Sequence, residues 1–315
     1  MLRANHAVRL GLRASSRNPE LAFLKALLDQ AGNLLALLPL LLAALLLAAV
    51  ALRGALLPAA LRTLRAALAL RWPLLGGVLA ALGILFLAST LFWAGTVPLL
   101  AADTELDQRP PRGNFVLLLS RGAARTLLAS LLGWGLALGF SSACTLALLA
   151  ALPAMLARPS LALALGASLI GTALILGSVL LDALARLTVI RAAAFADPPP
   201  AAFGKAVSLL GARLGACVAV TLAFLLLELI AGAVVAALTG FVSGVSFFDP
   251  GAELLAIAPR VAIGLAAAAV FSWLEVGHMG ALAALAADAE GLIGTPEPPQ
   301  PPVAELVIEA LPVEE

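Results

Sequence analysis

Residues 33–52 read NLLALLPLLLAALLLAAVAL and contain no charged side chain. An α-helix rises about 1.5 Å per residue, so about 20 residues cross the hydrocarbon core of a bilayer, which is roughly 30 Å thick. A continuous apolar run of this length is typical of a membrane-spanning helix and not of a water-soluble protein. The stretch therefore predicts that the chain crosses a membrane.

Five further stretches are similarly long and apolar, with at most one acidic residue each, so the chain predicts six spans: about 33–52, 73–98, 128–154, 161–182, 215–238 and 261–286. Only 12% of the 315 residues are charged, well below the roughly 25% that is usual in soluble proteins. A β-barrel would need strands in which apolar and polar residues alternate, whereas these runs are continuously apolar. We therefore expect an all-α, multi-pass transmembrane helical bundle with about six spans and cytoplasmic interfacial amphipathic helices.

The positions of Lys and Arg predict the orientation, because cytoplasmic loops carry an excess of these residues. With both termini inside, 13 of the 19 Lys and Arg are cytoplasmic. They fall in three segments: Arg3, Arg9, Arg13, Arg17 and Lys25; Arg109, Arg112, Arg121 and Arg125; and Arg186, Arg191, Lys205 and Arg213. We expect an N-in, C-in protein of a bacterial cytoplasmic (inner) membrane.

One loop conflicts with this orientation, since four arginines between Arg53 and Arg71 would lie outside. Residues 53–71 can also form an amphipathic helix along the membrane surface, with the arginines at the lipid headgroups. If the loop is cytoplasmic instead, the first span is a re-entrant hairpin. The sequence leaves both alternatives open.

A weak internal repeat of about 90 residues supports the six-span arrangement. In each unit a proline precedes a phenylalanine, and an amphipathic stretch and two spans follow; the pairs are Pro19 and Phe23, Pro111 and Phe115, and Pro200 and Phe203. Chance similarity among Leu- and Ala-rich segments is the alternative. The expected domains are a basic amphipathic segment (1–32), a six-span domain (33–287) divided by the repeat into three hairpin units, and a Pro-rich acidic tail (288–315).

Ionisable side chains within the spans are the candidate functional residues, because a charge in a bilayer is costly. Glu228 lies near the middle of the fifth span, Glu275 near the middle of the sixth, and His278 follows Glu275 by three residues on the same helix face. They could form an intramembrane proton or ion site. Alternatively, a neutral Glu hydrogen-bonded to His278, Ser272 or a backbone carbonyl could hold helices together.

Other features indicate structure rather than chemistry. Asp182 and Arg186 are four residues apart at the end of the fourth span, which predicts an ion pair. Cys144 and Cys217 fall inside apolar spans and read as buried free cysteines. Phosphate-binding loops and zinc-protease motifs are missing, and the basic residues are scattered. We expect no cofactor, no metal and no nucleic-acid partner, and the sequence favours a protein without enzymatic activity.

Two features could bind a protein partner. Gly135 and Gly139 form a G-x-x-x-G in the third span, which predicts close helix packing within the bundle or between protomers. From residue 294 the tail reads GTPEPPQPPVAELVIEALPVEE, which is either disordered or a short binding motif.

An Arg-Asn-Pro at 17–19, an amphipathic stretch and two spans, together with ARLTVIR at 185–191 and PPPAAFGKA at 198–206, resemble a group of bacterial six-span membrane proteins. The group includes the membrane domain fused to some glycerophosphodiester phosphodiesterases, and the resemblance covers roughly residues 13–287. The catalytic barrel of those enzymes has no counterpart here. The resemblance therefore implies a membrane domain without a defined activity or catalytic residues.

The leading functional hypothesis is a non-enzymatic accessory or scaffolding component that contacts membrane lipid and a partner. The alternative is a small transporter or channel that uses Glu228, Glu275 and His278.

Overall fold

The computed structural model describes residues 2–51, 56–106, 115–157, 161–247 and 252–293. Within these ranges it contains no strand and the following helices: α1 (Ala4–Arg17), α2 (Pro19–Ala51), α3 (Leu56–Leu106), α4 (Phe115–Ala157), α5 (Leu161–Ala193), α6 (Pro199–Ala212), α7 (Leu214–Phe247) and α8 (Ala252–Ala289). The tail from residue 294 and Pro111 of the expected repeat lie outside the described residues.

Six helices contain a segment long and apolar enough to cross a membrane: Pro19–Leu45, Trp72–Asp103, Phe115–Pro153, Leu161–Ala194, Leu214–Gly244 and Leu255–Ala289. They confirm the expected all-α, multi-pass bundle. Each helix extends beyond its predicted span, because polar residues that follow an apolar run do not end a helix. For example, α2 begins at Pro19, a residue suited to the first turn, and passes the expected domain boundary at residue 32 without a break.

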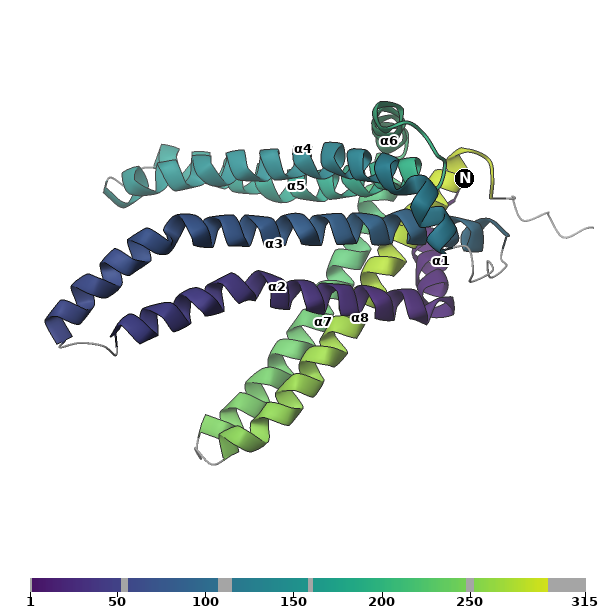
Figure 1. Ribbon diagram of the computed structural model, residues 1–315. Helices are drawn as coiled ribbons and strands as arrows, with labels where there is room; N and C mark the ends of the chain where they lie inside the picture. The colour runs from purple at the N-terminus through teal and green to yellow at the C-terminus, as the bar shows by residue number, and fades with distance from the viewer. Residues whose placement is uncertain (1, 52–55, 107–114, 158–160, 248–251, 294–315) are drawn as a thin grey trace, which may run out of the picture.

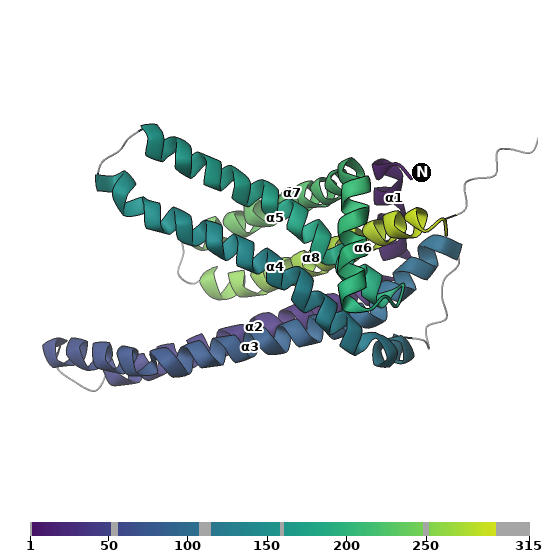
Figure 2. The same cartoon turned by 90° about the horizontal axis from the view of Figure 1, so that it is seen from above.

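The helices form three antiparallel hairpins, α2–α3, α4–α5 and α7–α8. Figures 1 and 2 show that the hairpins diverge from a common end, where α1, α6 and the N-terminus lie. We call this end the head and the opposite ends of the hairpins the tips. Since the hairpins separate toward the tips, the contacts that join all three are confined to the head side.

The hydrophobic core lies in the head, and α8 runs through it in contact with α1, α2, α3, α5 and α7. Every residue of α8 from Val276 to Ala287 is buried. Small side chains dominate this stretch, which lets several helices approach α8 closely. Large side chains from α3, α5 and α8 fill the space around it: Val97, Leu100, Leu187, Ile190, Leu282 and Leu285.

The amphipathic helix α1 packs its small-residue face on α8. Ala7, Gly11 and Ala14 are buried, while Arg9 and Arg13 are exposed on the other face. A Cβ atom at Gly11 would lie only 2.2 Å from the carbonyl oxygen of Gly277, so the backbones of the two helices nearly touch. The apolar face of α1 is therefore occupied within the chain.

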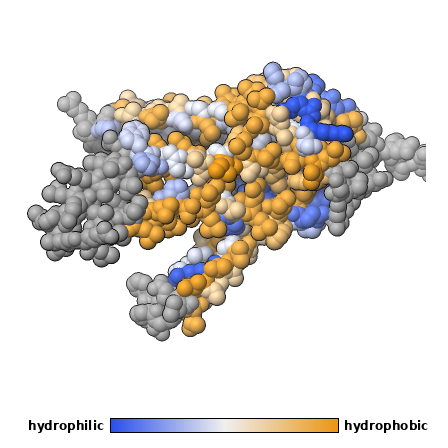
Figure 3. Space-filling model, in the orientation of Figure 1, coloured by the Kyte–Doolittle hydropathy of each residue, from blue (hydrophilic) through white to orange (hydrophobic). Residues whose placement is uncertain are grey.

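Toward the tips, the hairpins present large apolar side chains outward, as the orange surface in Figure 3 shows. Examples from all six long helices are Leu34, Leu82, Leu138, Leu169, Leu229 and Leu265, each more than half exposed. In water this surface would be unfavourable, whereas lipid chains are as apolar as leucine. The tip-side parts of the hairpins therefore have the surface of membrane-embedded helices.

The three hairpins fall within the three units of the expected repeat, which stays a prediction, and the amphipathic stretches of the units differ. Only the third is a separate helix, α6, which ends at Ala212 and is separated from α7 by Arg213. The stretches after Pro19 and Phe115 continue directly into α2 and α4. Residues 56–71 likewise belong to one helix with the second span, α3, at the tip end; Arg53 lies outside the described residues.

Candidate functional site

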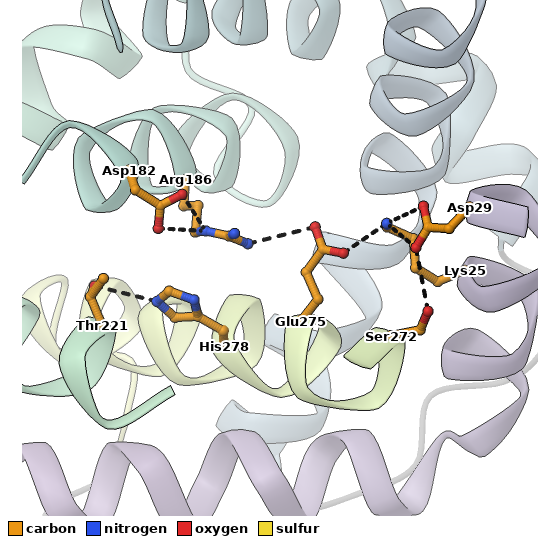
Figure 4. Close-up of polar contacts among 8 residues, drawn as sticks. All are labelled: Lys25, Asp29, Asp182, Arg186, Thr221, Ser272, Glu275 and His278. Atoms are coloured by element: carbon orange, nitrogen blue, oxygen red, sulfur yellow. Dashed lines mark hydrogen bonds and ion pairs between the residues drawn. The ribbon is translucent and has the colours of Figure 1, made fainter. Parts of the chain in front are cut away.

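Five charged side chains from three helices meet where the hairpins separate (Figure 4). Lys25 and Asp29 come from α2, Asp182 and Arg186 from α5, and Glu275 from α8. We call this group the central charge cluster. It joins all three hairpins, since α2, α5 and α8 belong to different ones.

Lys25 is the most deeply buried member of the cluster, with 4% of its surface exposed. Its ammonium Nζ lies 2.6 Å from Asp29 Oδ1 and 2.7 Å from Glu275 Oε2. The Ser272 hydroxyl also donates to Asp29 Oδ2 at 3.3 Å. A buried ammonium is tolerated only when charged partners compensate for its lost hydration, and here two carboxylates do so.

Arg186 forms the second half of the cluster. Its Nε donates to both carboxylate oxygens of Asp182, at 2.9 and 3.1 Å, which confirms the ion pair predicted from their spacing. The pair also reaches another helix, because Arg186 Nη1 lies 3.8 Å from Glu275 Oε1. Glu275 thus bridges a lysine of the first hairpin and an arginine of the second.

The cluster holds three carboxylates but only two cationic groups, so its formal charge is −1 when all five residues are ionised. Glu228 on α7 adds a further carboxylate nearby: it is partly buried and lies within electrostatic range of Arg186, Glu275 and Asp182. The region where the hairpins meet is therefore short of positive charge.

A cavity of about 330 Å³ adjoins the cluster between α2, α3, α4 and α8. The acidic residues Asp29 and Glu275 line it, together with polar, aromatic and aliphatic residues: Leu28, Asn33, Leu85, Phe86, Ser89, Thr90, Trp93, Ser130 and Trp134. Volumes of about 300 Å³ and more are typical of small-ligand sites, and such sites are often found between helices of a bundle. The cavity is large enough for a small polar group.

His278 does not belong to the central charge cluster, because its side chain points from α8 toward α7. It is 2% exposed, its Nε2 lies 3.3 Å from the Thr221 hydroxyl, and its ring stacks on Phe224 with centroids 5.0 Å apart. All of these partners are on α7. His278 therefore packs the α7–α8 hairpin, while Glu275, three residues earlier, faces α2 and α5.

The structure thus brings Glu275 into the cluster, places Glu228 beside it and turns His278 toward α7. Sequence reasoning missed Lys25 and Asp29, which had been assigned to a separate N-terminal segment. Their spacing of four residues, the same as that of Asp182 and Arg186, was the available signal. Their partnership with Glu275 depends on contact between hairpins and leaves no trace in local sequence.

The glycines that pack closely are not those of the G-x-x-x-G motif. Among the described residues, no atom of another helix lies within 4 Å of a Cβ built at Gly135 or Gly139, so these glycines do not pack within the bundle. Packing between protomers stays a prediction. On the same helix, Gly133 is covered instead, because its Cβ would lie 2.8 Å from Ala185 Cα of α5.

A second set of ion pairs ties the end of α8 to the head. Arg191 pairs with Glu290, and Arg213 pairs with Asp288, which also accepts the backbone N–H of Leu2 at 2.9 Å. The hydrogen bond from Arg191 lowers the pKa of Glu290, although partial burial acts in the opposite direction. These contacts hold the C-terminal ends of α5, α6 and α8 together, and they connect Leu2 near the start of the described chain to residues near its end.

Within the described ranges, no group of three or more His, Cys, Asp or Glu side chains is placed to hold a metal ion. Cys144 and Cys217 are free. No protein-family model, no curated protein and no solved structure matches this chain.

Proposed function

We propose that this chain is a membrane protein of the transporter type, which binds a small ligand in the cavity beside the central charge cluster. The observation that carries the proposal is Glu275, whose carboxylate bridges Lys25 and Arg186 and which is one of the residues that line the cavity. A binding group placed where three hairpins meet can influence how they move relative to one another. This arrangement suits a protein that binds a ligand and changes shape.

The energetics of the cluster support a functional role. Buried ion pairs often contribute little net stability, because the loss of hydration offsets the attraction between the charges. Ionisable residues within membrane spans usually mark ligand, ion or proton sites. A purely structural contact between these hairpins could be made with apolar residues, as it is around Leu187 and Leu282 deeper in the head.

The orientation that we propose places the head in the cytoplasm. Described basic residues gather there on α1, at the head-side ends of α4 and α5, and on α6, including Arg9, Arg13, Arg121, Arg191 and Lys205. Under the positive-inside rule this favours N-in, C-in in a bacterial cytoplasmic membrane.

The scaffold hypothesis stays a prediction, and one observation makes it the second choice. Its expected binding surfaces are the cytoplasmic amphipathic helices, the acidic tail and the helix-packing glycines Gly135 and Gly139. The apolar face of α1 is covered by α8, and the tail lies outside the described residues. Deleting residues 294–315 tests this hypothesis. If the protein is a scaffold, the truncated chain should fail to replace the wild type in cells. If it is a transporter, the truncated chain should still bind its ligand.

Native mass spectrometry of the protein purified in a mild detergent tests the proposed function. We expect a bound small molecule or lipid on the wild-type chain and its loss in Ser130→Leu, which fills the cavity without removing a charge. Ser120→Leu is the matched control, because Ser120 is exposed on the same helix and does not line the cavity. The identified species would then be assayed for transport into proteoliposomes. A bare wild-type protein, or equal binding by Ser130→Leu, would contradict the proposal.

A further inference from the structure

Resting on the proposed function, we infer that the ligand of the central cavity is an amphiphile that carries a protonated amine. The first step is charge. Of the five residues in the central charge cluster, only Asp29 and Glu275 line the cavity, and both are acidic. The two cationic side chains are already engaged with carboxylates. A cationic group in the cavity would bring the formal charge of the five residues and ligand to zero.

The second step is hydrogen bonding. An ammonium group has three N–H donors and no acceptor, so it needs several oxygen acceptors in different directions. The residues that line the cavity include Asp29, Glu275, Asn33, Ser89 and Ser130, whose side chains carry carboxylate, amide and hydroxyl oxygens. The described residues hold no group of three or more His, Cys, Asp or Glu placed for a metal ion, and an organic ammonium does not need one.

The third step is the aromatic lining. Trp93 and Trp134 both line the cavity, and the faces of indole rings attract cations. Each ring already lies near a cationic group of the chain, Lys25 Nζ at 5.9 Å from the Trp93 centroid and Arg186 Cζ at 5.8 Å from that of Trp134. An anionic ligand would instead meet two carboxylates and the negative faces of these rings.

The fourth step is the apolar part of the ligand. Farther toward the tips, the same α2–α3 hairpin holds a second pocket of about 300 Å³, which is lined by Leu38, Pro39, Leu42, Ala43, Pro73, Leu74 and Gly77. Asn33 of the first cavity and Pro39 of the second are six residues apart, or about 9 Å along a helix. A ligand with an ammonium at Glu275 and an alkyl chain along α2 and α3 would reach both sites.

Binding measurements on the delipidated full chain in detergent test this inference. The lipid probes are phosphatidylethanolamine, phosphatidylcholine and phosphatidylglycerol with identical acyl chains, and the soluble probe is dodecylamine. We expect phosphatidylethanolamine or dodecylamine to raise the Tm of the wild-type protein. The Kd of the same probe for the wild type should be at least about tenfold lower than its Kd for the Asp29→Asn variant. Phosphatidylcholine, whose quaternary ammonium lacks N–H donors, should bind more weakly than phosphatidylethanolamine.

The variants separate binding from folding. Asp29 has 38% of its side chain exposed, so Asp29→Asn should fold even where Glu275→Gln does not, and the Tm without ligand checks this. Glu290→Gln is the control, because it also removes a carboxylate from an ion pair but lies away from the cavity. It should bind the amine probes as the wild type does.

The outcomes distinguish the inference from the function on which it rests. Binding of phosphatidylethanolamine alone supports a lipid headgroup, and binding of dodecylamine alone supports a free amphiphilic amine. If the protein binds phosphatidylglycerol preferentially and Ser130→Leu loses that binding, the inference of an amine ligand is wrong. The proposed function would stand, because the cavity would still be a ligand site. If no probe binds and no species co-purifies, both the inference and the proposed function fail.

Discussion

At the scale of single residues, Glu275 is the side chain that joins the three hairpins. Its two carboxylate oxygens face different hairpins, one toward Lys25 at 2.7 Å and the other toward Arg186 at 3.8 Å. Because the second contact is long, Arg186 holds mainly to Asp182 on its own helix. The bridge between the first and third hairpins is therefore the strong one, and the bridge to the second is weaker.

Replacing Lys25 with Met should destabilise the protein strongly. The change leaves Asp29 and Glu275 facing each other without their shared cation, and removal of one partner from a buried ion pair costs about 3–5 kcal/mol. Because Asp29 is partly exposed, we expect the lower end of this range in the free energy of unfolding, measured by denaturant titration in mixed micelles.

A double-mutant cycle checks that the loss arises from this contact. Lys25→Met combined with Glu275→Gln should lose less stability than the sum of the two single changes, since the unpaired carboxylate is gone. Additive losses would show that Lys25 and Glu275 do not interact in the folded protein.

The contact between Arg191 and Glu290 should contribute stability in a pH-dependent way. Because the pKa of Glu290 is lowered from its ordinary value of 4.5 in the fold, the contribution is present above about pH 4.5 and disappears as the pH falls through the lower folded value. The Glu290 side chain is 42% exposed, so solvent screening keeps the effect small. We expect Glu290→Gln to have a slightly lower Tm than the wild type at pH 7 and a smaller difference from the wild type at pH 3. An equal difference at both pH values would contradict this assignment.

At the scale of helices, the close contact between α1 and α8 explains why an amphipathic N-terminal helix does not lie free at the membrane surface. The contact requires glycine at residue 11, because a Cβ there would also lie 2.7 Å from the Ala281 Cβ. The α8 helix cannot move away from α1 easily, because α8 also contacts α2, α3, α5 and α7.

Gly11→Ala should therefore loosen α1, while Gly135→Ala should not harm the fold. Overpacking of this kind costs typically about 1–3 kcal/mol, and we expect a lower Tm and faster proteolysis within residues 4–17. At Gly135 the space is open among the described residues, and alanine is a better helix former than glycine by roughly 0.5–1 kcal/mol. Equal behaviour of the two variants would contradict the packing described for α1.

At the scale of the whole molecule, three hairpins joined at one end expose apolar surface toward their tips and keep their charged contacts at the head. This division sets the direction in which the protein sits in a bilayer. The short helices α1 and α6 and the C-terminal end of α8 lie at the head, while the C-terminal ends of α2, α4 and α7 lie at the tips (Figures 1 and 2).

Cysteine labelling in intact cells should reveal this orientation. In a background without Cys144 and Cys217, Leu161→Cys at the tip-side start of α5 should react with a membrane-impermeant thiol reagent. Ser16→Cys at the exposed surface of α1 should react only after the cells are opened. The reverse pattern would place the head outside and contradict the N-in, C-in orientation.

The sequence by itself determined the helical membrane bundle, its six spans and the Asp182–Arg186 pair. These follow from apolar run length and from spacing within one helix, which are local properties. Only the tertiary structure decided that Lys25 and Asp29 join Glu275, that His278 faces α7, and that α8 covers α1 while Gly135 and Gly139 stay open. Such contacts depend on how hairpins cross and how closely small residues let them approach, so residues distant in sequence become partners without any pattern that records it.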